Sequence, residues 1–237
     1  MTDAHCHVSC GDLSVRELLI GRDFFGIHPW ETLDETTGTS RALVPDVPVV
    51  PDVSFLAALR SKLLANPNAG VGEIGLDRLK VRDIPPLMRE VFESQLALAL
   101  ELRRPVVLHG AKCWGQVVAA VKRMIGGGLA MGGKRQAFLF HGFSRSDGLI
   151  PEIVELNGFI SVGPAVLNDH AVNYRELVKK IPLDRLLVET DAVVGARVPT
   201  RPHIRDVLVK TADILNLSAA ELERITDENA DRFLGIV

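Results

Sequence analysis

Short apolar runs recur along the chain and alternate with stretches of helical periodicity. The runs are rich in branched and aromatic residues, as expected for strands that are buried on both faces. They cover residues 2–8, 24–28, 69–76, 105–109, 137–141, 158–162 and 185–189. Strands that alternate with helices predict a parallel sheet with crossover connections, and therefore an α/β fold.

Helices are predicted between these runs from apolar spacing and from signals at the helix ends. The stretch 85–103 begins with prolines and carries apolar residues at helical spacing. Ser218 and Glu221 form a capping box that starts the last helix, and Gly235 ends it. The other predicted helices cover residues 52–65, 114–125, 147–157, 171–181 and 202–215.

The order of these elements predicts a TIM-type β/α barrel, formed as one domain over residues 1–237. The connection 9–23 is too short for the crossover helix, extra strand and second helix of a full barrel. We therefore predict a distorted or seven-stranded barrel that lacks one β/α unit near the N-terminus. In such a barrel, the strand with His5 and His7 pairs directly with the strand around Gly26 and His28. Residues 31–51 and 126–134 are predicted loops.

Side chains that can bind metals lie at the ends of the predicted strands. In a β/α barrel these ends converge on one face, where active sites lie. Any one of these histidines alone is more often a buried structural residue, but the whole set favours a functional site. The residues at or just past the strand ends are His7, His28, Glu73, His109, His141 and Asp191.

The first strand carries two histidines that flank Cys6. Residues i and i+2 of a strand point to the same face, so His5 and His7 can bind one ion together. Imidazole suits zinc, whereas carboxylate suits magnesium or manganese, so the mixed set leaves the metal open.

Later strands offer ligands for a second ion, from His109 and His141. Glu73 could bridge the two ions, as carboxylates do in two-metal hydrolases. Asp191 could bind an ion and accept a proton from the attacking water, or it could cap a helix. Glu189 is either a partner of these ligands or a buried structural carboxylate.

The composition, the net charge and the cysteine spacing limit which functions and which compartment we expect for the protein. The chain has 237 residues, 47% of them hydrophobic, and a net charge of −3, which argues against a general basic surface for nucleic acid. A polyanionic substrate would be held by metal or by a few Arg and Lys. The unpaired spacing of Cys6, Cys10 and Cys113 indicates a reducing compartment. With no signal segment or membrane span, we expect a soluble cytoplasmic protein without an obligate protein partner.

Eight segments occur along nearly the whole chain in the same order as in one known protein family. They cover residues 3–7, 26–29, 72–77, 92–102, 105–109, 141–144, 181–191 and 229–235. In these segments the chain resembles the TatD-like metal-dependent hydrolases, most specifically at Glu73 in Gly-Glu-Ile-Gly-Leu-Asp and at Asp191 in Glu-Thr-Asp. The resemblance implies a binuclear site that hydrolyses phosphodiesters, commonly DNA. It assigns one ion to His5, His7, Glu73 and Asp191, and the other to Glu73, His109 and His141.

Loops around the predicted site depart from this family. The Arg that often follows the fourth-strand histidine is absent, and Lys112 is the candidate substitute as a point charge. Val193-Val194-Gly195 replaces the family's Pro and aromatic residue after the Asp191 segment. His28, Lys112 and Trp114 are the candidate substrate-binding residues. Trp30 and Trp114 could stack on bases, but packing at the barrel rim is favoured for both.

We therefore predict a divalent-metal-dependent hydrolase that uses a metal-bound hydroxide at a binuclear site. Its substrate would be DNA or another phosphodiester, which makes it a phosphodiesterase or deoxyribonuclease, with two ions of Mg, Mn or Zn as cofactors. The catalytic residues would be Asp191 and Glu73. One alternative is an amidohydrolase-type barrel enzyme that cleaves a small amide, ester or lactone. Such enzymes often bridge their metals with a carboxylated lysine, and no lysine ends a predicted strand here. The other alternative is a non-catalytic interaction protein that retains the fold.

Overall fold

The computed structural model describes residues 1–33, 53–126, 136–193 and 203–236. They form two compact units, one of Met1–Arg22 with Leu139–Val237 (unit 1) and one of Asp23–Phe138 (unit 2). Strand β6 (Phe138–Phe140) contains the boundary between the units along the chain. Most of the predicted loops 31–51 and 126–134 (residues 34–51 and 127–134) lies outside the described residues, as do Val194 and Gly195. The single domain over residues 1–237 stays a prediction.

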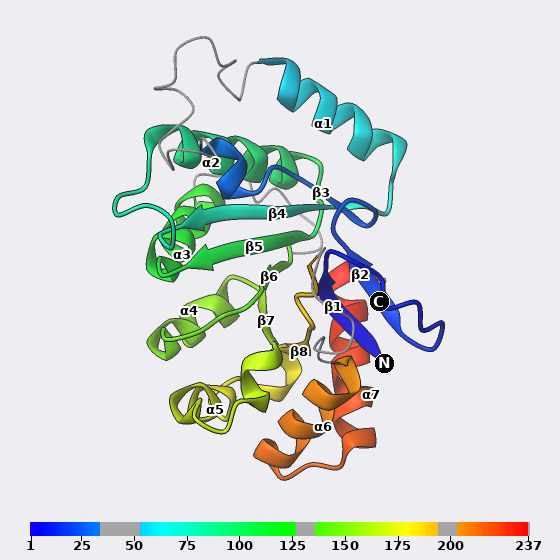
Figure 1. Cartoon of the computed structure of the whole chain (residues 1–237). Coiled ribbons are helices and arrows are strands. Elements are labelled where there is room, and N and C mark those ends of the chain that lie inside the picture. The colour runs from blue at the N-terminus through cyan, green and yellow to red at the C-terminus, as the bar shows by residue number, and fades with distance from the viewer. Residues whose placement is uncertain (34–52, 127–135, 194–202, 237) are drawn as a thin grey trace. The chain divides into compact units, whose positions relative to one another are not determined.

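Unit 2 is built on three parallel strands: β3 (Phe24–Phe25), β4 (Gly70–Asp77) and β5 (Val106–Ala111). Figure 1 shows β4 and β5 side by side and running in the same direction. Every residue of β4 is buried, as expected for a central parallel strand. The register places Gly75 of β4 opposite His109 of β5.

Helices cover the strands of unit 2 through their apolar faces. Helix α2 (Pro86–Glu101) packs against β4 and starts at a proline, whose missing N–H costs nothing in the first turn. Helix α3 (Trp114–Met124) packs against β5, and α1 (Val53–Ala65) packs against α2 and β3. The short helix η1 (Pro29–Thr32) follows β3 and contacts α2 and β4.

Unit 1 joins the two ends of the chain. Strand β1 (Thr2–Cys6) contacts β8 (Leu186–Val188), which pairs in parallel with β7 (Gly158–Val162). The link between β1 and β8 is polar and buried, because Asp3 accepts hydrogen bonds from the N–H of Thr190 at 2.9 Å and from its Oγ1 at 2.6 Å.

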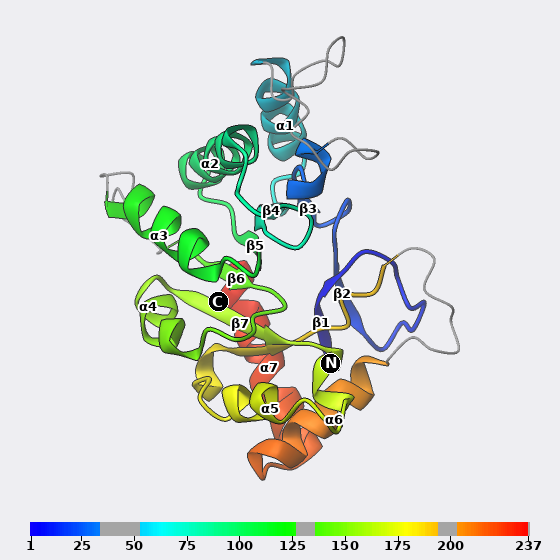
Figure 2. The ribbon, with the colours of Figure 1, turned by 60° about the vertical axis from the view of Figure 1, so that its left-hand side comes forward.

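Two long helices support these strands. Helix α7 (Ala219–Leu234) packs on β1 and β8, and α6 (Ile204–Leu215) lies beside it, as Figure 2 shows in orange and red. The buried Asn229 of α7 donates from its amide to the carbonyls of Leu183 and Leu186, both at 2.7 Å. These bonds satisfy backbone acceptors next to β8 and fix α7 along it.

Shorter elements complete unit 1. They are the helices α4 (Ile150–Glu155) and α5 (Val172–Val178) and the 3-10 turns η4 (Asp147–Leu149), η5 (Pro164–Leu167) and η6 (Leu183–Arg185). None of the helices in the described ranges is long and apolar enough to cross a bilayer. The predicted 171–181 helix is shorter than expected, since α5 ends at Val178.

The predicted count of seven strands is wrong, because the described residues contain eight. The additional strand is β2 (Arg16–Leu19), and β1 pairs in parallel with it instead of making the direct pairing predicted for the strand around Gly26 and His28. Two of its four residues are charged, so β2 shows no apolar run. No helix forms in residues 7–15 between β1 and β2. The shortened region thus keeps a strand but lacks the crossover helix.

Candidate functional site

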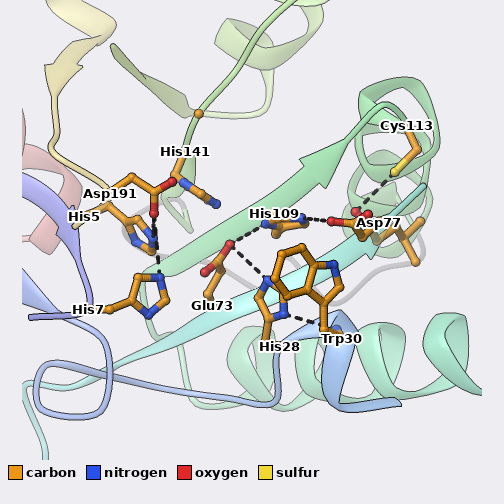
Figure 3. Close-up of polar contacts among 12 residues, drawn as sticks. His5, His7, His28, Trp30, Glu73, Asp77, His109, Cys113, His141 and Asp191 are labelled. Atoms are coloured by element: carbon orange, nitrogen blue, oxygen red, sulfur yellow. Dashed lines mark hydrogen bonds and ion pairs between the residues drawn. The ribbon is translucent and has the colours of Figure 1, made fainter. Parts of the chain in front are cut away.

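Unit 2 brings together a buried carboxylate and two imidazoles (Figure 3). Oε1 of Glu73, on β4, lies 2.5 Å from Nδ1 of His109 on β5 and 3.7 Å from Nε2 of His28. One ligand atom from each of these residues lies within 4.8 Å of the others, so the three can hold one metal ion. The predicted substrate-binding residue His28 is therefore placed as a potential ligand.

A second carboxylate, which is not among the predicted site residues, holds the other side of His109. Oδ2 of Asp77 lies 2.7 Å from Nε2 of His109, and Oδ1 accepts a hydrogen bond from the N–H of Leu79 at 2.5 Å. Burial acts to raise the pKa of Asp77, but the hydrogen bonds from His109 and Leu79 outweigh it and leave the pKa lowered. Asp77 shares a strand with Glu73 at a spacing of i+4, which places both on one face and could have identified it.

Close approach of β4 and β5 positions these groups. Gly75 has φ +156°, and a Cβ there would lie 2.0 Å from the carbonyl oxygen of His109. Only glycine allows this approach, so Gly75 sets the distance between the Glu73 and His109 backbones.

Unit 1 brings together the other predicted ligands. Nε2 of His5 lies 3.5 Å from Oδ1 of Asp191, and Nε2 of His7 lies 3.8 Å from the same oxygen (Figure 3). The three residues can hold one metal ion. Hydrogen bonds between β1 and the segment after β8 fix them, since the N–H of Asp191 donates to the His5 carbonyl at 3.0 Å and the N–H of His7 donates to the Ala192 carbonyl at 2.8 Å.

These three side chains differ in access to solvent. His5 is fully buried, whereas the Asp191 side chain is 46% exposed. Asp191 also adopts a left-handed backbone conformation with φ +49°, which is uncommon outside glycine, although Asn and Asp adopt it more often than other residues. Such a conformation is a recurring feature of functional positions.

His141 lies beside this group, at the start of the loop that follows β6. Its ring centroid is 4.1 Å from that of His5, and its Nδ1 is 3.8 Å from Oε1 of Glu189. Glu189 is buried and accepts hydrogen bonds from the N–H of Gly142 at 2.7 Å and from Oγ of Ser161 at 2.5 Å. These hydrogen bonds hold the carboxylate next to His141, and both roles of Glu189, partner of a ligand and buried structural carboxylate, stay predictions.

The remaining substrate-binding candidates differ in exposure. Trp114 is 5% exposed and its ring packs on Gly110, which agrees with the packing interpretation. Lys112 is exposed. Trp30 is 39% exposed, and its ring lies 5.0 Å from that of His28 and 3.8 Å from Nζ of Lys80. Trp30 is therefore the tryptophan that presents a ring next to a ligand group.

Each unit thus contains a donor set of nitrogen and oxygen atoms, two imidazoles and one carboxylate, which suits divalent cations such as Zn or Mn. The predicted bridging by Glu73, and the predicted pairing of His109 with His141 around one ion, join residues of the two units. They stay predictions.

Comparisons with known proteins identify the family. The model of the family "TatD related DNase" matches residues 21–235. An uncharacterized metal-dependent hydrolase of Bacillus subtilis (strain 168), YabD, is 32% identical over 172 residues, which cover 70% of this chain and 65% of YabD. The chain therefore spans less than two thirds of the length of YabD. A 3'-5' ssDNA/RNA exonuclease TatD of Klebsiella pneumoniae (strain 342) is 28% identical over 222 residues, covering 89% of this chain and 76% of that protein.

Solved structures show the same fold. The crystal structure of YJJV, a TatD homolog from Escherichia coli K12, superposes with a TM-score of 0.67 at 21% identity and covers 96% of this chain and 79% of that one. An uncharacterized amidohydrolase from Saccharomyces cerevisiae has a TM-score of 0.67 at 18% identity, covering 92% and 80%. The predicted fold class, an α/β fold of the TIM-type barrel kind, is confirmed. The chain belongs to the TatD-related DNase family of metal-dependent hydrolases.

Proposed function

We propose that the protein is a divalent-metal-dependent phosphodiesterase that acts on DNA or a related nucleic acid. The observation that carries this proposal is the grouping of an exposed carboxylate, Asp191, with His5 and His7 in unit 1. Family membership supports metal-dependent hydrolysis, and the exonuclease from Klebsiella pneumoniae supports a nucleic acid as substrate.

The residues of each donor set have distinct parts in this proposal. A divalent ion held by either set would polarise a phosphoryl oxygen and neutralise the charge that develops on it. Asp191 is the one carboxylate of the two sets that solvent reaches readily, so it accepts the proton of the attacking water. Glu73, buried between His28 and His109, serves as a ligand only.

Each unit has a further carboxylate next to a proposed ligand histidine. Asp77 fixes the ring of His109, and Glu189 lies beside the ring of His141. Such partners select the tautomer of a ligand histidine and raise its basicity. Neither carboxylate touches the substrate in this proposal.

Cleavage of a short labelled oligonucleotide by wild type and Asp191→Asn, at saturating Mg, Mn or Zn, tests this function. Asn keeps the size and one oxygen of Asp191 but removes its basicity, so the rate should fall about 10²- to 10⁴-fold while the bound metal falls less. Asp213→Asn is the matched control, because Asp213 is an exposed residue of α6 in the same unit. Equal rates for wild type and Asp191→Asn would remove Asp191 from the mechanism. No cleavage by metal-loaded wild type would favour amide or ester hydrolysis instead.

A further inference from the structure

A cleft of about 1070 Å³ opens in unit 1 next to Asp191. Four stretches of chain line it: the loop after β6, the loop after β7, the segment from His170 to Lys180 that contains α5, and the segment after β8. Tyr174 fixes one wall, since its hydroxyl oxygen accepts a hydrogen bond from the N–H of Gly163 at 3.1 Å. Asp191, the proposed proton acceptor, therefore lies at the edge of the cleft.

Most charges that line the cleft are neutralised locally. Lys180 forms an ion pair with Asp147, and Glu176 pairs with Lys179 at 2.7 Å. Arg145 differs: among the described residues that line the cleft it is the cation without a hydrogen bond or ion pair from its side chain. It is exposed and lies on the loop between β6 and η4.

Arg145 also holds an unfavourable backbone conformation. Its φ is +59°, in the left-handed region that glycine adopts without strain. Stability alone would favour glycine at this position. Arg145 is thus a long, unpaired cation in a strained loop beside a cleft. This combination indicates a role in binding.

We propose that this cleft holds a nucleotide next to the scissile bond of a nucleic acid strand, and that Arg145 binds the phosphate of that nucleotide. The inference rests on the proposed function. A strand that approaches Asp191 and Glu189 meets negative charge, and the protein has a net charge of −3. An unpaired guanidinium offsets that repulsion and matches phosphate oxygens with two parallel N–H donors.

The rest of the cleft suits the sugar and base of the same nucleotide. Pro164, Ala165 and Leu177 provide apolar surface, while Ser144 and Asn173 add polar groups at the lining. Ligand sites combine largely apolar walls with a few placed polar groups. The phosphate contact supplies affinity without reading the base, so binding should show little sequence preference.

Fluorescence anisotropy of a labelled single-stranded oligonucleotide with phosphorothioate linkages, which resist cleavage, tests this inference on the metal-loaded protein. Arg145→Gly suits the left-handed backbone, so the variant should melt at or above the temperature of the wild type. Its affinity should fall about 10-fold or more, the range expected for a lost charge-assisted hydrogen bond. The slope of log Kd against log salt should fall by about 0.7, the value for one phosphate contact on a single strand. Arg145→Lys should retain part of the affinity.

The matched control is Arg224→Ala, which removes an exposed arginine of α7 that pairs with Glu228. Its oligonucleotide affinity should equal that of the wild type. An Arg145→Gly affinity within twofold of wild type, or no binding by the wild type, overturns the inference. Displacement of the oligonucleotide by a deoxynucleoside 5'-monophosphate at equal concentration would assign the cleft to free nucleotides and overturn strand binding. Binding that depends on Arg145 in a protein that cleaves no phosphodiester would instead contradict the proposed function alone.

Discussion

Nε2 of His109 lies 2.7 Å from Oδ2 of Asp77, on the side of the ring opposite Glu73. The lowered pKa of Asp77 makes its carboxylate an acceptor for Nε2 in the tautomer of His109 that carries the proton there. Nδ1 then presents its lone pair toward Glu73, which is the arrangement that a shared cation requires. Asp77 therefore determines which nitrogen of His109 can bind a metal.

Substitution of Asp77 by Asn should weaken metal binding without removing a ligand. Asn can still accept a hydrogen bond but lacks the charge that polarises His109, so the metal affinity should fall about 10- to 100-fold. Calorimetric titration with Zn or Mn measures this change. Asp83→Asn, an exposed position of the same unit, should leave the affinity unchanged. Equal affinities for Asp77→Asn and Asp83→Asn would show that Asp77 does not support the ligand.

Metal removal should lower the thermal stability, since ions bind the folded donor sets. A ligand at 100 times its Kd adds about 2.7 kcal/mol, or roughly 5–10 °C in Tm for a chain of this size. Differential scanning calorimetry with and without EDTA measures the shift. His7→Ala should reduce the EDTA effect, whereas His170→Ala, outside both donor sets, should keep it. A Tm that EDTA leaves unchanged in the wild type would count against both donor sets as metal sites.

Gly75 should tolerate no side chain. A Cβ at this position would press on the carbonyl of His109 at 2.0 Å, so Gly75→Ala should lower the free energy of unfolding by about 1–3 kcal/mol. Gly115→Ala is the control, because a Cβ there meets nothing within 4 Å and alanine favours helix α3 by about 0.5–1 kcal/mol. Urea unfolding of both variants gives the comparison. A stable Gly75→Ala would mean that β4 and β5 can separate without loss.

Cys113 should make stability depend on alkaline pH. Burial, followed by the negative charge of Asp77, raises the pKa of its thiol to about 12, whereas an unfolded cysteine titrates near pH 8.5. Between these values the folded state keeps a proton that the unfolded state releases, so stability falls as the pH rises above about 9. Cys113→Ala should reduce this slope by up to about 1.4 kcal/mol per pH unit.

Urea unfolding at pH 8, 9 and 10 measures the slope. Val117→Ala is the control, because it removes a buried side chain of α3 without changing an ionisable group. It should lower stability by a similar amount at each pH. Identical slopes for wild type and Cys113→Ala would show that the thiol is accessible in the folded state.

The order of the elements and the ligand-bearing strand ends could be predicted from sequence because their signals are local. An apolar run of 158–162 predicts β7, and the spacing of His5 and His7 predicts that they share a face. These signals need no knowledge of which segments meet. The protein's fold class followed from the same alternation of runs.

The missed features depend on contacts between distant segments. β2 is half charged and becomes a strand only because β1 offers it a partner. The sequence places Asp77 on the face of Glu73, but the role of Asp77 comes from its contact with His109 on the next strand. The cleft beside Asp191 is formed by α5 and by loops that come from separate parts of the chain, so Arg145 carried no signal in the sequence. In all three cases, contacts between segments that are far apart in the sequence determine the structure.

The donor set of unit 1 takes its histidines, His5 and His7, from β1 and the residue after it, and takes Asp191 from the segment after β8. Hydrogen bonds between Asp3 and Thr190 hold β1 and this segment together. During synthesis, the two histidines leave the ribosome long before Asp191 exists. A growing chain therefore cannot complete this set until the synthesis of most of its residues has finished, and contacts of such sequence separation form late. The proposed nuclease activity would therefore be absent until the segment after β8 has been made and has docked on β1.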